Sequence, residues 1–309
     1  MAQLLAQVPQ QIINGLTLGS VYALIALGYS MVYGILQLLN FAHGDVYMVG
    51  AFIGFGVLAA FLPESTPLLP TALIILLMLV AAMLGCGFLG VAIEWFAYRP
   101  LRNAPRIAPL ISALGMSILL ENSVQLTLTA QYRVYHTEKL IPSSAGLDLG
   151  PAHLSAVRAL VIGAAILMMI GLWYLVNRTR LGRSMRAVAL DREAAAMMGV
   201  DVDRVIVLTF FIGSALAGAG GVLTGLVFTR VWHTMGFTAG LKGFTSAVIG
   251  GIGNIPGAML GGMLIGLLEA FATGFISSTF TDVIVFIVLI LFLLVRPRGL
   301  LGATAAQKV

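Results

Sequence analysis

Charged residues are scarce in this chain of 309 residues, of which only 9% are Asp, Glu, Lys or Arg and 60% are hydrophobic. A typical soluble domain has about 25% charged residues. So few charged side chains cannot cover a water-exposed surface of this size. Intrinsic disorder is excluded as well, because it requires low hydrophobicity and high net charge. The composition therefore places the chain in a lipid bilayer.

Several chemical groups are also missing or rare. Cysteine occurs once, as Cys86 in an apolar run, so we expect a small buried side chain and no internal disulfide. The four histidines lack metal-site spacing, and no carboxylate pair or Ser/His/Asp set indicates catalysis. No lysine stands in a phosphate-binding Gly-x-x-x-x-Gly-Lys-Ser/Thr motif. The N-terminus has no positively charged stretch and is not a secretory signal peptide.

Long uncharged runs predict an all-α polytopic membrane protein with eight or nine transmembrane helices in one domain, 1–309. About 20 apolar residues are needed to cross the hydrocarbon core. Such runs lie at about residues 11–36, 44–62, 70–98, 107–130, 158–177, 205–229, 243–268 and 270–295. The Gly-rich stretch 250–257 interrupts the last two. We therefore expect a short or broken helix at 240–252, which either crosses or re-enters, and spans at 256–275 and 280–295.

Basic residues gather in three loops, which the positive-inside rule assigns to the cytoplasm. They are Arg99, Arg102 and Arg106; Arg178, Arg180, Arg183, Arg186, Arg192 and Arg204; and Arg296, Arg298 and Lys308. Residues 131–156 and the short turn 63–67 are then external. Counting spans back from Arg99 places the uncharged N-terminus outside, and the last arginines place the C-terminus in the cytoplasm.

Weak sequence similarity between two parts of the chain suggests an inverted repeat, an arrangement found in many transporters. Gly19-Ser20 recurs as Gly213-Ser214, and residues 41–44 leading to Gly50 resemble 241–244 leading to Gly250. Chance matching between two Gly-rich apolar segments explains this similarity equally well. Small residues at close spacing also allow helices to pack tightly in lipid, which accounts for most of the 36 glycines.

The cytoplasmic loop 178–204 is patterned as an amphipathic helix. Within 184–198, apolar residues recur at spacings of three and four: Ala187, Leu190, Ala194, Met197 and Met198. Gly199 follows as a C-cap. Such a helix can lie on a membrane or dock into a protein groove. Its Ala-rich face lacks Trp and Phe, and acidic residues stand among the arginines, so docking is favoured.

The same loop carries a resemblance. Residues 193–199, Glu-Ala-Ala-Ala-Met-Met-Gly, fit the Glu-Ala-Ala…Gly loop signature of ABC importer permeases, although Thr-Phe-Phe-Ile at 209–212 replaces the Ile-x-Leu-Pro part. More specifically, the chain resembles permeases of high-affinity branched-chain amino-acid importers at 14–24, 40–44, 50–51, 181–187, 250–258 and 296–300. The resemblance therefore covers nearly the whole chain.

This resemblance implies a permease subunit of an ATP-driven (ABC) importer in the bacterial cytoplasmic (inner) membrane, with branched-chain or other hydrophobic amino acids as substrates. Its implied partners are a second homologous permease, two cytoplasmic ATPase subunits, an external substrate-binding protein and membrane lipid, but no nucleic acid. The chain itself would be no enzyme and would bind no cofactor, because its partners use ATP and Mg²⁺. The residues expected to contact the ATPase are Arg186, Leu190, Glu193, Ala194, Ala195, Met198 and Gly199.

Isolated polar residues within the apolar runs are candidates for the translocation pathway. They are Asn40, His43, Asp45, Glu121 and Asn254. His43 and Asp45 could equally satisfy backbone groups at a helix break. For Glu121, a hydrogen bond to Asn122, Ser123 or a neighbouring helix is the simpler interpretation.

Three other acidic residues are expected near helix ends. We expect Glu94 to pair at the cytoplasmic interface, Asp282 to cap the last helix, and Glu269 to pair at an interface or contact the binding protein. A largely uncharged route suits a zwitterion with an apolar tail, and equally urea or a short amide. A stand-alone channel or secondary transporter is the alternative from another class; it would need a central ionisable pair, and only Glu121 is central.

Overall fold

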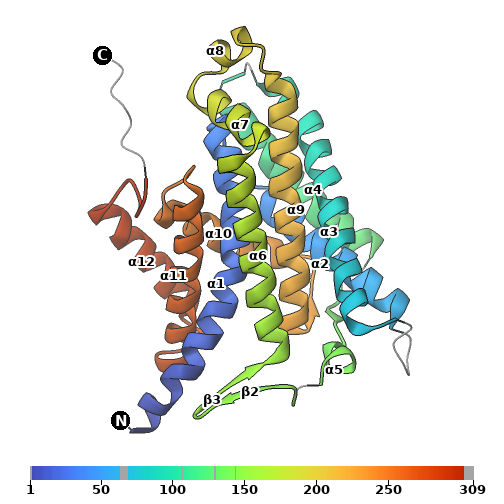
Figure 1. Ribbon diagram of the computed structural model, residues 1–309, viewed down its shortest axis with the longest axis vertical. Helices are drawn as coiled ribbons and strands as arrows, with labels where there is room; N and C mark the ends of the chain where they lie inside the picture. Colours follow the sequence, from blue (N-terminus) through green and yellow to red (C-terminus); the bar gives the residue numbers. More distant parts are fainter. Residues whose placement is uncertain are drawn as a thin grey trace.

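The computed structural model describes residues 2–62, 69–102, 104–105, 107–128, 130–142 and 144–302, which form one largely helical bundle (Figure 1). Its long helices are α1 (Ala2–Leu36), α2 (His43–Phe61), α3 (Thr71–Ile93), α4 (Ile107–Thr127), α6 (Ala156–Arg178), α9 (Val202–Phe228) and α11 (Ile255–Phe275). Shorter helices are α5 (Thr137–Leu140), α7 (Arg180–Leu190), α8 (Arg192–Met197), α10 (Met235–Gly250) and α12 (Thr281–Val295). The expected all-α membrane fold is confirmed.

Seven of the described helices are long and apolar enough to cross a membrane: α1, α2, α3, α4, α6, α9 and α11. The apolar helix α12 has 15 residues and α10 has 16. Together they correspond to the predicted spans, including the three pieces expected after residue 240. The Gly-rich interruption is where α10 ends, and Asn254 caps α11 by accepting the N–H of Gly257 at 3.0 Å.

The centre of the bundle is α1, which packs along α9, α10 and α11 (Figure 1). Residues 19–32 of α1 are all buried, as expected for a helix that is apolar on every side. Its contact with α11 depends on the absence of side chains: a Cβ on Gly266 would lie 2.1 Å from the backbone nitrogen of Gly19. This close approach is the small-residue packing predicted from the glycine content.

Helices α2 and α10 both begin inside the bundle, and their first turns touch. A Cβ on Gly44 would lie 2.3 Å from the carbonyl oxygen of Gly236 and 2.8 Å from the Cα of Gly240. Along α1, α10 approaches Tyr22, Ile25 and Tyr29. The following turn reaches Gly34, near the end of α1.

The segment after α9 therefore consists of two parts. It starts at strand β4 (Arg230–Val231), just after α9 finishes, and continues as the short helix α10 near the middle of the bundle (Figure 1), and the turn after α10 reaches Gly34 of α1. Residues 240–252 thus belong to the second part of the 16-residue helix α10 and the turn after it, and the choice between crossing and re-entry stays open. Residues 41–44 lie at the start of α2, whereas the similar residues 241–244 lie inside α10. The inverted repeat therefore stays a prediction.

An ion-pair cluster joins the three C-terminal helices. The Nζ atom of Lys242 lies 2.7 Å from a carboxylate oxygen of Glu269 and 2.8 Å from one of Asp282. Asp282 was expected to cap α12, and that expectation is wrong: Phe280 occupies the N-cap position, and the Asp282 carboxylate is directed to Lys242. The expected pairing of Glu269 is confirmed, although its partner is on α10 rather than at a surface.

Small strands and the helix α5 lie at the end of the bundle opposite α7 and α8, where the N-terminus also lies (Figure 1). Strands β2 (Gly146–Leu149) and β3 (Ala152–Ser155) form an antiparallel hairpin, and β1 (Arg133–Val134) pairs with β4. The backbone N–H of His153 donates to the side-chain oxygen of Gln10, which attaches the hairpin to α1. Residues 131–156, predicted as a loop, thus carry some regular structure. The predicted turn 63–67 lies outside the described residues.

Candidate functional site

Helices α7 and α8 form the connection between α6 and α9 (Figure 1). Asp191 separates them: its backbone is extended (φ −155°, ψ 115°), and its carboxylate accepts the N–H groups of Glu193 and Ala194, each at 3.0 Å. The single helix predicted over 184–198 is therefore wrong. A side-chain oxygen that satisfies the free N–H groups of a new helix favours a break over continuation.

The two helices divide their apolar residues between the bundle and its surroundings. Met185, Val188 and Ala195 are buried, and they attach the segment to the bundle. In contrast, Leu190, Met197 and Met198 are 86%, 82% and 84% exposed. Three large apolar side chains, exposed on so short a segment, indicate a surface that contacts another protein.

The residues expected to contact an ATPase lie mainly on this exposed side. Six of the seven are exposed: Arg186, Leu190, Glu193, Ala194, Met198 and Gly199. The seventh, Ala195, points into the bundle. Gly199 directly follows the C-cap residue Met198 and adopts φ 81°, a conformation that glycine accepts without strain. The expected helix end at Gly199 is confirmed.

Two arginines of the first predicted cluster lie beside the segment that joins α8 to α9. Arg99 lies 3.3 Å from Asp203, in the first turn of α9, and Arg102 pairs with both Asp203 and Glu94. The pairing expected for Glu94 is thereby confirmed. The C-terminal segment reaches the same end, where the side-chain nitrogen of Asn254 donates to the carbonyl oxygen of Leu301 at 2.7 Å. Arg106 and Lys308 lie outside the described residues.

A second polar region surrounds the break between α1 and α2, where Asn40, His43 and Asp45 are each 1% exposed. The Asp45 carboxylate accepts a hydrogen bond from Ser117 of α4 through one oxygen. Within the described part of the chain, the other oxygen and the side-chain nitrogen of Asn40 have no hydrogen-bond partner, and the His43 ring has only the backbone of Ile25 within reach. Buried polar atoms usually have partners, so these atoms require an explanation.

The other two pathway candidates lie apart from each other. Glu121 follows Ser117 by one turn of α4, on the face that meets α2, and no described residue forms a hydrogen bond with its carboxylate. Asn122 bonds instead to the carbonyl of Ile118, so the hydrogen bond suggested between Asn122 and Glu121 is not formed. Asn254 lines a cavity of about 550 Å³ near Arg186, at the end of the bundle that carries α7.

Two residues that matter at these sites were missed in the sequence. Ser117 holds the Asp45 carboxylate, and the Tyr98 hydroxyl donates to the carbonyl of Leu39 at 3.1 Å and to the Asn40 side-chain oxygen at 3.2 Å. Both lie in apolar runs without a motif, so only their partners reveal them. Among the residues that the structure places, no group of three or more His, Cys, Asp or Glu could hold a metal ion.

Comparison with known proteins gives a family for this arrangement. Residues 11–294 match the family described as "Branched-chain amino acid transport system / permease component". The high-affinity branched-chain amino-acid transport permease BraD of Pseudomonas aeruginosa is 44% identical over 306 residues, 97% of each chain. The corresponding Escherichia coli permease LivH is 42% identical over 312 residues, again 97% of each chain.

The chain belongs to this permease family. A guanosine ABC transporter permease of Bacillus subtilis is also similar, with 26% identity over 317 residues and 90% of each chain covered. The resemblance read from the loop signature and the N-terminal segments is thereby confirmed. As a multi-pass membrane permease, the protein has two candidate regions: the exposed α7–α8 segment and the buried polar break between α1 and α2.

Proposed function

We propose that this permease is the membrane-spanning subunit of an ATP-driven importer for branched-chain or other hydrophobic amino acids. The observation that carries the proposal is the α7–α8 segment, where Leu190, Met197 and Met198 are almost fully exposed at the arginine-rich end. A small apolar helix face of this kind fits a groove in a partner protein. The proposed partners there are two ATPase subunits, which use ATP and Mg²⁺, while the permease is not an enzyme and binds no cofactor.

The orientation follows from the charges. The arginine-rich end with α7, α8 and the C-terminus would face the cytoplasm, and the end with the β2–β3 hairpin and the N-terminus would face outward. The outer end is then the docking side for an external binding protein. A second homologous permease would complete the translocation pathway in the inner membrane.

The buried polar break is the proposed part of the pathway within this chain. Asn40, His43 and Asp45 lie there with unsatisfied polar atoms, and Glu121 lies on the adjacent face of α4. Polar groups without partners inside a membrane bundle support a role in substrate passage. Asn254, near the cytoplasmic end, would lie at the exit of the route.

A second candidate is a permease of the same type with another small polar cargo, such as urea, a short amide or a nucleoside. The similarity to a guanosine transporter permease favours keeping this option. It is distinguished from the amino-acid proposal by uptake specificity. A self-powered channel or secondary transporter is distinguished by energy source, because its transport would continue without ATP.

The proposal is tested by isolating the intact complex and measuring uptake in proteoliposomes with its binding protein. We expect ATPase subunits to copurify and ATP to drive uptake of leucine, isoleucine and valine, but not of urea or guanosine. Isolation without an ATPase, or uptake unaffected by ATP depletion, would refute the importer. Uptake of guanosine or urea instead of the amino acids would refute the substrate assignment.

We expect Glu193→Lys to uncouple ATP hydrolysis from import while the permease inserts normally. Glu193 is exposed in the first turn of α8, where a carboxylate interacts favourably with the helix dipole and a lysine does not. Gly199→Glu should also uncouple hydrolysis from import, because it adds a charged side chain where the backbone φ of 81° favours glycine. The measurement is ATP hydrolysed per leucine imported, with Arg296→Glu as an exposed charge change at the same end. Wild-type coupling in both α8 variants would remove α8 from the mechanism.

A further inference from the structure

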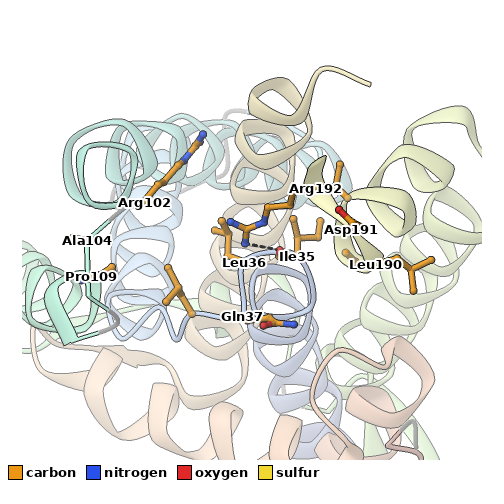
Figure 2. Close-up of a pocket in the computed structure, with 12 residues that line it drawn as sticks. Ile35, Leu36, Gln37, Arg102, Ala104, Pro109, Leu190, Asp191 and Arg192 are labelled. Carbon is orange, nitrogen blue, oxygen red and sulfur yellow. Dashed lines mark hydrogen bonds between the residues drawn. The ribbon is translucent and has the colours of Figure 1, made fainter. Parts of the chain in front are cut away.

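A hydrogen bond connects the beginning of α8 to the end of α1. One guanidinium nitrogen of Arg192 donates to the carbonyl oxygen of Ile35 at 2.9 Å (Figure 2). Ile35 is in the last turn of α1, where carbonyl groups have no partner within the helix. Arg192 therefore connects α8 directly to the residues that precede the α1–α2 break.

A second series of contacts starts on the other side of the same segment. Asp203, in the first turn of α9, pairs with Arg102, and Arg102 pairs with Glu94. The Glu94 side chain is only 1% exposed and begins a π-helical segment, Glu94–Tyr98. Such segments are rare in helices and frequent at functional sites. Tyr98 ends the segment and donates to Leu39 and Asn40 in the break.

The two series end on either side of Gln37, at Ile35 and at Leu39 and Asn40, and segment 37–42 has the features of a hinge. Gln37 adopts φ 54°, a conformation that costs free energy for residues other than glycine. A cavity of about 290 Å³ separates the segment from α7 and α8, lined among others by Leu36, Gln37, Arg102 and Arg192 (Figure 2). Partial burial and then the nearby charge of Arg102 lower the pKa of Arg192. The cavity leaves space beside the segment, and Arg192 bonds to Ile35 just before it.

We propose that Arg192 and the Arg102–Glu94–Tyr98 series are positioning residues that transmit movement of α8 to the beginning of α2. When an ATPase displaces α8, Arg192 shifts the end of α1, and Tyr98 shifts Asn40. Together they reposition the adjacent His43 and Asp45. Arg192 and Arg102 are partly buried, and their planar guanidinium groups form hydrogen bonds of fixed geometry, so a displacement of one partner is passed to the other. This inference rests on the proposed importer function.

The test uses the complete complex with its binding protein and measures leucine import per ATP hydrolysed. Arg192→Met and Tyr98→Phe should each lower this ratio about five- to tenfold, while ATP hydrolysis by the complex persists. Arg192→Lys, which keeps a donor, should restore part of it. The matched controls are Arg296→Met, an exposed arginine at the same end, and Tyr132→Phe, an exposed tyrosine in contact with Trp232. Both should leave the ratio unchanged.

The arrangement in two series gives a sharper expectation. Arg102→Met combined with Tyr98→Phe should be no worse than the more severe single variant, because both interrupt one series. Arg192→Met combined with Tyr98→Phe should be worse than either, because separate contributions add. The inference is overturned if Arg192→Met and Tyr98→Phe leave the ratio of leucine imported to ATP hydrolysed at the wild-type value, whether or not both rates fall. If Arg192→Met does not assemble, Tyr98→Phe alone decides. Failure of the wild-type complex to import with ATP would instead refute the proposed function.

Discussion

Lys242→Met should lower the free energy of unfolding by about 3–5 kcal/mol, the usual loss when one partner of a buried ion pair is removed. Lys242 is 6% exposed and lies between the carboxylates of Glu269 and Asp282. Without it, the Glu269 carboxylate, whose side chain is 13% exposed, would have no ion-pair partner among the residues that the structure places. Denaturant titration of the purified permease in detergent, followed by circular dichroism, measures the change.

The two carboxylates should contribute unequally. Asp282 is 54% exposed, so Asp282→Asn should cost only about 0–1 kcal/mol, as for surface pairs. Lys242→Met combined with Glu269→Gln should recover most of the lost stability, because no unpaired buried charge is left. Equal destabilisation by Lys242→Met and Asp282→Asn would contradict the assignment of Glu269 as the main partner. Full stability of Lys242→Met would show that the cluster contributes nothing.

This cluster also illustrates what the sequence could and could not predict. The spans were predicted nearly to their ends, because a membrane helix needs about 20 apolar residues and the runs have that length. Glu269 and Asp282 were seen as isolated acids, but their common partner Lys242 is 27 residues from Glu269 and belongs to another helix. No periodicity within one helix encodes such a contact. The cap predicted for Asp282 followed a local rule that the tertiary contact overrode.

At the candidate sites, too, the sequence predicted features of single segments but not the contacts between helices. Asn40, His43 and Asp45 were identified because polar residues are rare in an apolar run, and the structure brings them together at the start of α2. Tyr98 and Ser117 were missed, since neither is unusual until its partner is known. In the cytoplasmic segment the apolar spacing predicted one helix over 184–198, and the break at Asp191 was missed. Its carboxylate instead starts a second helix.

The meeting of α2 and α10 gives the second large expected effect: Gly44→Ala should abolish most of the import activity. The added Cβ would lie 2.3 Å from the carbonyl oxygen of Gly236 and 2.8 Å from the Cα of Gly240, and both are backbone atoms that cannot rotate away. The two first turns would have to separate, at a cost of about 1–3 kcal/mol for overpacking. His43 and Asp45 flank Gly44, so separation also displaces the proposed pathway residues.

Gly56→Ala on the same helix is the matched control, because a Cβ at Gly56 has no atom within 4 Å. Alanine is the better helix former, so this variant should be more stable by about 0.5–1 kcal/mol and should import normally. The measurements are leucine uptake per purified complex and the midpoint of thermal unfolding. Equal behaviour of the two variants would show that α2 and α10 separate freely at Gly44. Opposite behaviour, with Gly44→Ala inactive and less stable, would show that import requires the close contact of α2 and α10.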